Sequence, residues 1–362
     1  MIKEKLKFAG VLVGIALMIF SCDKDDDIDP SPTPTPTSTV EFATIPGDAE
    51  IPSFEMGIIE VTNEQYKDFL NQAFAEGDIS YDFSTEMVTD NSNDQPMIHL
   101  GGTRIIKDHN QDGIYELVEM ESPINRCFIG FNTATNQFEI IDPISIDWNQ
   151  YFDTSKYPNA VDNIDDWAEL NPNGTGFFEE PDADKLLPTI EEIRTWPINH
   201  MKYYGAEGFA RFYNYDLPTK AQWRYAGQGG QGFQFATSDG TNNPDVAWFN
   251  PTAPTTYWKG HAQPALSKSP NPYGVYNIGG GIWEWCKDWY DGYTVFGGSP
   301  KVDEDFFIDD DMTYAQSEGI YLKCVLGGSF NFFSATMMPL WNHAAAPHTG
   351  NDHSGMRVVK NL

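Results

Sequence analysis

The chain has 362 residues, among which 53 acidic side chains stand against 22 Lys and Arg, giving a formal net charge of −31. This charge repels nucleic acid, anionic lipid and highly sulfated polysaccharides, and so argues against direct binding of these partners without divalent cations or a local basic patch. Aromatic residues make up 14% of the chain, which is enough to build the core of one large domain.

The N-terminus has the organisation of a lipoprotein signal peptide. A lysine-rich start over residues 1–7 precedes an apolar run over residues 8–20 that is too short to span a bilayer. Ile19-Phe20-Ser21-Cys22 then resembles a lipobox. We expect residues 1–21 to be removed and Cys22 to be lipidated; an ordinary secretory signal with an incidental cysteine is the alternative.

Residues 22–40 are predicted to form an extended tether. The cluster Asp23-Lys24-Asp25-Asp26-Asp27 repels itself, and the alternating Pro and Ser/Thr residues of 30–37 favour a stiff polyproline conformation. The cluster after Cys22 is also similar to the export signal that sends Bacteroidota lipoproteins to the outer face of the outer membrane. We therefore expect a lipid-anchored outer-membrane protein displayed at the cell surface; the periplasm-facing leaflet is the alternative.

Capping chemistry predicts where helices begin. Thr62–Gln65 and Thr219–Gln222 each have the T-x-x-Q spacing of a capping box. A third helix is expected over residues 203–213. Short aromatic and β-branched runs such as 246–250 and 322–330, separated by Asn, Gly and Pro, make the mixture α+β with much irregular coil.

One segment has the residue spacing of a calcium-binding loop. Asp108, Asn110, Asp112 and Glu119 fit D-x-N-x-D-G-x5-E, in which these four side chains converge on one ion. The flanking sequences indicate the strands of a hairpin rather than the helices of an EF-hand. A calcium-binding hairpin loop and a plain Asp-Gly turn therefore both remain open.

The stretch NPYGVYNIGGGIWEWCKDWY over residues 271–290 combines glycines, tryptophans and carboxylates in an unusual way. It resembles the signature of the formylglycine-generating enzyme, or sulfatase-modifying factor, family. Other segments match that family in order, namely EVTNEQY at 60–66, residues 196–211, LPTKAQWRYA at 217–226, VLGGSF at 325–330 and GMRVV at 355–359. The resemblance implies a single loop-rich α+β domain, a C-type-lectin-like variant with short strands and few helices. We place it at residues 41–362, with a divergent insertion at about 76–190.

The resemblance also implies a structural calcium ion. The positions that correspond to the family's ligands are Asn277, Gly280, Ile282 and Glu284. Side-chain amide, carboxylate and backbone carbonyl oxygens suit calcium. The alternative is that Glu284 accepts hydrogen bonds from backbone amides without a metal.

The family's catalytic cysteines have no counterpart here. In members that convert a sulfatase cysteine to formylglycine, a cysteine pair after G-G-S-[F/W] binds copper and the substrate thiol, yet residues 327–343 contain no cysteine. Neither Met337 nor Met338 can supply a thiolate. We therefore expect no catalytic residues and no copper.

Two further groupings are weaker candidates. Cys286 and Cys324 lie next to expected strands and could form a disulfide if those strands are neighbours, with buried thiols as the alternative. His343, His348 and His353 could supply imidazoles to iron or zinc, with loop histidines as the alternative.

The sequence thus favours a non-catalytic binding or assembly module. The resemblance places such lipoproteins in polysaccharide utilisation, including that of sulfated polysaccharides, or in gliding and secretion machinery. The expected partners are the membrane, through the N-terminal lipid, and a polysaccharide or an envelope protein complex, but no nucleic acid. The alternative is an enzyme, either an atypical formylglycine-generating (sulfatase-activating) protein or a metal-dependent oxidase.

Overall fold

The computed structural model describes residues 39–100, 105–107, 116–118, 126–145, 188–250, 262–290, 322–345, 347–348 and 350–362. The expected lipidation site Cys22 and the Asp108–Glu119 loop ligands lie outside these residues. The described helices are α1 (Asn63–Glu76), α3 (Ile190–Thr195), α4 (Tyr203–Phe212) and α5 (Lys220–Gly227), with 3-10 turns η2 (Pro143–Ser145) and η5 (Ser334–Met337). The strands are β1 (Phe42–Ile45), β2 (Phe54–Gly57), β3 (Ile79–Asp82), β4 (Met87–Asp90), β5 (Gln95–His99), β6 (Ile105–Lys107), β7 (Glu116–Val118), β8 (Ile129–Asn132), β9 (Gln137–Ile140), β10 (Trp283–Trp289), β11 (Lys323–Leu326), β12 (His343–Ala345), β13 (Ser354–Gly355) and β14 (Val359–Asn361).

The helices begin where the capping chemistry predicts. The hydroxyl of Thr62 accepts from the Gln65 amide at 3.3 Å, and the Gln65 side chain accepts from the Thr62 amide at 3.0 Å. Thr219 and Gln222 form the same reciprocal pair ahead of α5. Helix α4 matches its expected range to within one residue. A third capping box, at Thr189–Glu192 before α3, was not predicted.

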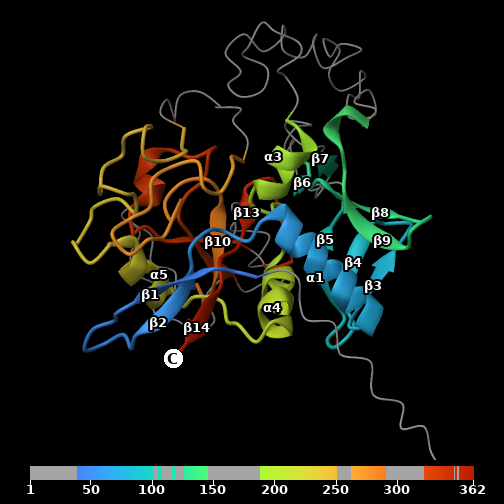
Figure 1. Ribbon diagram of the computed structural model, residues 1–362, viewed down its shortest axis with the longest axis horizontal. Coiled ribbons are helices and arrows are strands. Elements are labelled where there is room, and N and C mark those ends of the chain that lie inside the picture. Colours follow the sequence, from blue (N-terminus) through green and yellow to red (C-terminus); the bar gives the residue numbers. More distant parts are fainter. Residues whose placement is uncertain are drawn as a thin grey trace, which may run out of the picture. The chain divides into compact units, whose positions relative to one another are not determined.

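The central sheet has the order β12-β11-β10-β13, in which β13 is parallel to β10 and the other neighbours are antiparallel (Figure 1). Strands β1, β2 and β14 form a second sheet, and β3, β4 and β5 form a third. Two further two-stranded sheets, β6-β7 and β8-β9, are hairpins. The β6-β7 hairpin confirms the expected strands that flank the candidate calcium loop.

The core lies on both faces of β10. Trp283 and Trp285 join a large cluster with residues of α1 and α4, whereas Cys286 joins a second cluster with Trp223 of α5. Successive side chains of a strand point to opposite faces. Glu284 therefore faces α5, between the layers of the fold rather than toward solvent.

The α+β, loop-rich class expected from the sequence is confirmed. Of the two runs noted above, 322–330 contains β11, whereas 246–250 forms no strand. Among the described residues, no helix is both long and apolar enough to cross a membrane.

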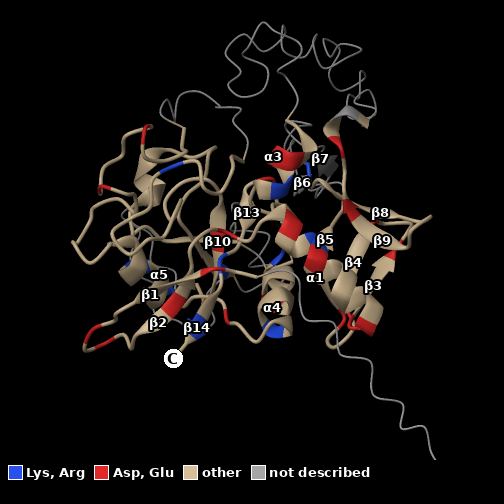
Figure 2. Cartoon of the chain, in the orientation of Figure 1, with Lys and Arg blue, Asp and Glu red and all other residues tan. Residues whose placement is uncertain are grey.

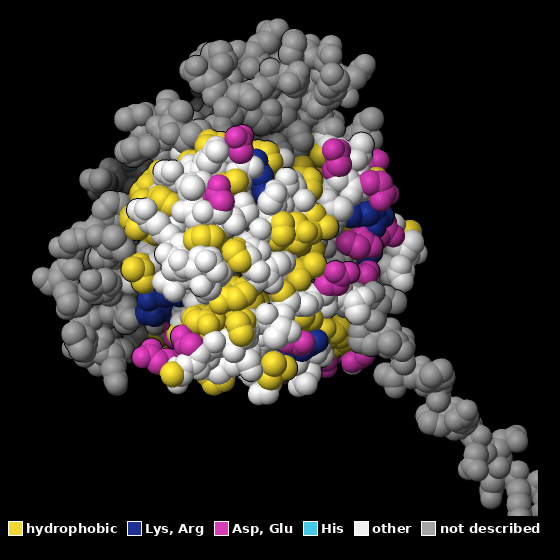
Figure 3. Space-filling view, turned by 60° about the vertical axis from the view of Figure 1, so that its left-hand side comes forward, with side chains coloured by type: hydrophobic (Ala, Val, Ile, Leu, Met, Phe, Trp, Pro, Cys, Tyr) yellow, Lys and Arg dark blue, Asp and Glu magenta, His cyan; other side chains and the backbone are white. Residues whose placement is uncertain are grey.

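Charge is unevenly distributed over the surface. In Figure 2 acidic residues lie on both sides of β10, with basic residues scattered among them. On the face drawn in Figure 3, apolar side chains spread over the centre, while acidic side chains gather along the right-hand edge.

Candidate functional site

The centre of the site is a buried carboxylate on β10 that is bound by a buried guanidinium. Glu284 and Arg357 are both 0% exposed. Arg357 Nη2 donates to Glu284 Oε1 at 2.8 Å, and Arg357 Nε lies 3.1 and 3.2 Å from the two carboxylate oxygens. Trp223 Nε1 donates to Oε2 at 2.7 Å. A buried carboxylate requires such partners, and here a cation and an indole N–H supply them.

Arg357 also ties together three separate parts of the fold. Its Nη1 donates to the carbonyl of Gly57 at the end of β2, and its Nη2 donates to the carbonyl of Tyr276, both at 2.8 Å. The planar guanidinium can make these contacts simultaneously because its donors point in fixed directions. Through Arg357, the G-M-R-V-V segment therefore connects β2, the loop of residues 271–282 and β10.

A second buried carboxylate, Glu60, lies beside this pair. Glu60 is 0% exposed, and its Oε2 is 3.7 Å from Arg357 Nη2. Neither of its carboxylate oxygens has a hydrogen-bond partner among the described residues. Burial raises the pKa of Glu60 to about 8, and the charge of Glu284 adds to the rise, whereas Arg357 and the nearby side chain of Asn277 oppose it. One guanidinium faces two carboxylates, so Glu60 requires either a proton or another cation.

The glycine-rich loop places Asn277 against Glu60. Asn277 adopts a left-handed backbone with φ 46°, and its Nδ2 donates to the carbonyl of Ala265 at 2.9 Å. Its Oδ1 is buried without a hydrogen-bond partner in the described part of the chain. Gly281 has φ 72°, and a Cβ there would lie 2.9 Å from Glu60 Oε1. The loop thus places the Asn277 oxygen in the same buried region as the two Glu60 oxygens, and none of the three has a hydrogen-bond partner among the described residues.

Carboxylate and amide oxygens are the kind of ligand that calcium prefers, and the carboxylate without a hydrogen-bond partner here is that of Glu60 rather than Glu284. Of the four expected ligands, Asn277 offers an unpartnered oxygen, and Gly280 and Ile282 lie on the same loop. Glu284 is already bound by Arg357 and Trp223. Glu60 supplies the unpartnered carboxylate instead. The sequence analysis noted Glu60 only as the first residue of E-V-T-N. A glutamate flanked by Ile58, Ile59 and Val61 was the signal that could have identified it.

The loop after Gly327-Gly328-Ser329 packs into the domain. Ser329 and Phe330 are 0% exposed, and Met337 is buried in a small cluster with Phe249. Gly328, with φ 74°, approaches Thr336 so closely that a Cβ would lie 2.4 Å from Thr336 Oγ1. Where the family's catalytic members carry thiols, this chain therefore has apolar packing.

The suggested disulfide between Cys286 and Cys324 is not formed, which corrects that expectation. The β10–β11 register pairs Trp285 with Val325 and then becomes irregular, so the two cysteines are not direct partners. Each sulfur instead contacts a carbonyl, Cys286 that of Glu284 and Cys324 that of Trp289. Both thiols and that of Cys127 are buried.

The three C-terminal histidines do not form a metal site in the described residues. His343 stacks on Trp283 with ring centroids 4.6 Å apart, whereas His348 packs edge-on against Tyr204. His353 Nδ1 lies 2.5 Å from Asp352 Oδ1. No group of three His, Cys, Asp or Glu side chains in the described residues could hold a metal. In the described residues the three imidazoles therefore do not come together as one ligand set, unlike the suggested site.

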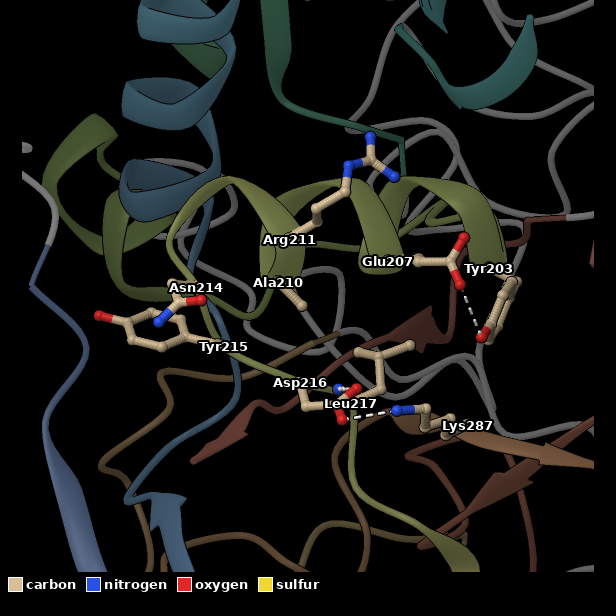
Figure 4. A pocket seen from close by; sticks show the side chains of 9 residues that line it. All are labelled: Tyr203, Glu207, Ala210, Arg211, Asn214, Tyr215, Asp216, Leu217 and Lys287. Carbon is tan, nitrogen blue, oxygen red and sulfur yellow. Dashed lines mark hydrogen bonds and ion pairs between the residues drawn. The ribbon is translucent and has the colours of Figure 1, made fainter. Parts of the chain in front are cut away.

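A polar pocket of about 270 Å³ is lined by residues of α4, by the segment that follows α4 and by Lys287 of β10, and none of the predicted site residues lines it (Figure 4). Tyr203 OH donates to Glu207 Oε1 at 3.2 Å, and Lys287 Nζ lies 2.6 Å from Asp216 Oδ2. Arg211 points away from these pairs in Figure 4 and contacts Asp90. Glu207, Lys287 and Arg211 of this pocket thus each have a hydrogen-bond or ion-pair partner.

Comparison with known proteins finds several partial matches. The chain is 36% identical over 116 residues to a formylglycine-generating enzyme of Streptomyces coelicolor, covering 30% of this chain and 36% of that protein. It is 29% identical over 167 residues to the serine/threonine-protein kinase pkn1 of Chlamydia pneumoniae, covering 46% and 24%. It is 36% identical over 156 residues to the chaperone protein LppX of Paenibacillus barcinonensis, covering 39% and 50%. The chain thus spans at most half the length of these three relatives.

Solved structures align with the chain at low similarity. The crystal structure of CarF aligns with a TM-score of 0.43 at 14% identity, covering 90% of this chain and 99% of that chain. PvdO from Pseudomonas aeruginosa aligns with a TM-score of 0.34 at 21% identity, covering 47% and 63%.

The family inferred from the sequence motifs is confirmed. A family model described as the sulfatase-modifying factor enzyme 1-like domain matches residues 37–362. The chain therefore belongs to the family of sulfatase-modifying factor enzyme 1-like domains.

Proposed function

We propose that this protein is a lipid-anchored envelope protein whose domain binds or assembles partners and performs no thiol-based oxidation. The observation that carries this proposal is the composition and packing of the loop after Ser329. Residues 330–343 contain no cysteine, and the loop buries Phe330 and Met337. Copper-dependent oxidation of a substrate thiol needs accessible thiolate ligands.

The chain's other thiols do not replace that pair. Cys127, Cys286 and Cys324 are each at most 1% exposed. Burial raises the pKa of Cys286 well above its ordinary value, so this thiol is held protonated and unreactive. Cys22 precedes the matched domain and is assigned to lipidation. The domain therefore offers no accessible thiol for the thiol-dependent form of the enzyme alternative.

The scaffold role of calcium is part of this proposal. Glu60 and Asn277 would hold the ion, which would supply the positive charge that the Glu60–Arg357–Glu284 group lacks. With one hard cation, the two buried carboxylates and one guanidinium would have a full complement of positive partners. The ion would thus fix the 271–282 loop against the end of β2.

The setting of the module follows from its N-terminus. Lipidation of Cys22 and the acidic, proline-rich tether support display on the outer membrane, at the cell surface. A polysaccharide-utilisation system or the gliding and secretion machinery would provide the polysaccharide or envelope protein complex as partner. The strongly acidic chain argues against nucleic acid as a ligand.

Metal analysis of the purified protein tests the proposal. We expect calcium and no stoichiometric copper or iron. Calcium should raise the melting temperature of the wild type and of Glu55→Gln, a control glutamate on β2 that is paired only with Lys360 in the described residues. It should raise that of Glu60→Gln much less. Stoichiometric copper that is lost on changing His343 and His348 to Ala would instead establish the enzyme alternative.

A further inference from the structure

We propose that the β3–β4 and β8–β9 hairpins form a docking surface for a basic partner protein. In this arrangement the partner inserts an apolar side chain beside Phe83 and places Lys or Arg side chains against the surrounding carboxylates. The proposal names a partner surface for the binding role proposed above. It uses none of the residues of the β10 site.

The surface is built on a continuous aromatic cluster, defined here as Phe74, Tyr81, Phe83, Phe131 and Phe138. Phe138 is 1% exposed and lies in the core, whereas Phe83 is 63% exposed. The ring of Phe131 connects them, with centroids 4.9 Å from Phe138 and 5.4 Å from Phe83. Tyr81 stacks on Phe131 at 5.0 Å. The exposed ring is therefore the outer end of an ordered cluster, not an isolated surface residue.

Local hydrogen bonds hold this cluster in place. The Asn71 side chain of α1 makes two hydrogen bonds of 2.8 Å with the backbone N–H and C=O of Phe138. On the other hairpin, Ser84 donates to Asp82 Oδ1 through its amide at 2.8 Å and its hydroxyl at 2.7 Å, which fixes the turn that carries Phe83. A pre-ordered aromatic anchor loses little conformational freedom on binding, which favours affinity.

The cluster lies in an acidic and cation-poor region. Neither residues 71–100 nor residues 127–145 contain a Lys or Arg. Figure 2 accordingly marks acidic residues, and no basic ones, on these hairpins. The exposed carboxylates on the same segments are Glu76, Asp78, Asp82, Glu86, Asp94 and Glu139. Burial raises the pKa of Tyr81, and the charges of Glu86 and Asp82 raise it further, so these carboxylates act on the cluster directly.

The negative charge of this surface determines which kind of partner can bind it. A second copy would bring the same carboxylates against themselves on a chain with a net charge of −31. Nucleic acid and anionic lipid are repelled for the same reason. A partner protein with a basic and apolar patch fits both the aromatic cluster and the carboxylates around it. Its cations can pair with the carboxylates and can also lie over the aromatic rings.

The test uses a synthetic peptide of alternating Lys and Leu as the probe, with a Glu and Leu peptide as the charge-reversed probe. Binding to the full-length protein is measured by fluorescence anisotropy at low and physiological salt. Phe83→Ser is compared with Leu266→Ser, because Leu266 is 60% exposed and lies outside the cluster. We expect Phe83→Ser to weaken binding of the Lys and Leu peptide by about tenfold, as loss of an interface anchor does. Leu266→Ser should leave it unchanged, and the Glu and Leu peptide should not bind.

A charge variant provides a second measurement. Glu86→Gln should reduce the association rate and its salt dependence while leaving the protein folded, since Glu86 is exposed. Equal binding by Phe83→Ser and Leu266→Ser would overturn the proposal in favour of general charge attraction. A concentration-dependent dimer lost in Phe83→Ser would assign the surface to a second copy, and neutral oligosaccharide binding lost in Phe83→Ser would assign it to a sugar. None of these results bears on the missing thiol chemistry, so this proposal and the proposed function can fail separately.

Discussion

Glu284 and Arg357 form an ion pair that is closed to solvent on every side, with Oε1 of the glutamate 2.8 Å from Nη2 of the arginine. The pair joins the W-E-W strand to the G-M-R-V-V segment, two of the motifs that identify the family. The same guanidinium also faces Glu60 at 3.7 Å. The stability of the domain therefore depends on how three buried charges are balanced.

Replacing Arg357 with Met should strongly destabilise the domain. The substitution removes the cation from two carboxylates that are 0% exposed. Breaking a buried ion pair in this way costs about 3–5 kcal/mol. Lys287→Met is the matched control, because its partner Asp216 is 34% exposed and such a pair contributes about 0–1 kcal/mol. Urea unfolding followed by circular dichroism measures both. Equal losses of unfolding free energy in the two variants would contradict the central role of Arg357.

Stability in the absence of calcium should fall as the pH rises from about 4.5 to about 8. In the folded protein Glu60 keeps its proton until its raised pKa of about 8, whereas an ordinary glutamate loses it near 4.5. Between these values the folded state binds more protons than the unfolded state, so the free energy of unfolding decreases with pH. The measurement is urea unfolding in a chelator, comparing the wild type with Glu60→Gln across this range.

The Glu60→Gln variant isolates this effect from that of other carboxylates. Glutamine cannot ionise, so the difference in unfolding free energy between the variant and the wild type should grow in favour of the variant up to about pH 8 and then level off. A difference that does not change with pH would show that Glu60 does not titrate in this window.

Gly281→Ala should destabilise the protein and weaken calcium binding. A Cβ at this position meets Glu60 Oε1 at 2.9 Å, and the backbone has φ 72°. Gly232→Ala is the matched control, because Gly232 has φ 66° but a Cβ there meets nothing within 4 Å. The control therefore reports only the backbone cost, about 1 kcal/mol. Calcium titration and thermal unfolding should show a larger effect at Gly281, and an equal effect would remove Gly281 from the proposed site.

Much of the fold could be predicted because local chemistry determines it. The capping boxes at Thr62–Gln65 and Thr219–Gln222 involve residues within one helical turn, so the sequence alone predicts where each helix begins. The strands on either side of residues 108–115 could be predicted because short apolar runs flank a local turn sequence. The family motifs supplied the loop-rich class, which periodicity alone does not reveal.

The charge balance of the site could not be predicted, since it joins residues far apart in the chain. Glu284 was expected to bind calcium or backbone amides, but its partners come from Trp223 and Arg357, 61 and 73 residues away. The role of Glu60 likewise appears only when the segment that follows β2 lies beside the glycine-rich loop. The irregular β10–β11 register, which separates Cys286 from Cys324, is also a tertiary feature.

The most direct test is co-expression of this protein with a sulfatase that carries the target cysteine, followed by mass spectrometry of the target peptide. A formylglycine-generating enzyme serves as the positive control. The absence of cysteine from residues 330–343 predicts that the target cysteine stays unmodified with this protein and is converted only by the control. Formylglycine formed by this protein at a rate comparable to the control would contradict the claim that the domain keeps the family's fold without its thiol-based oxidation.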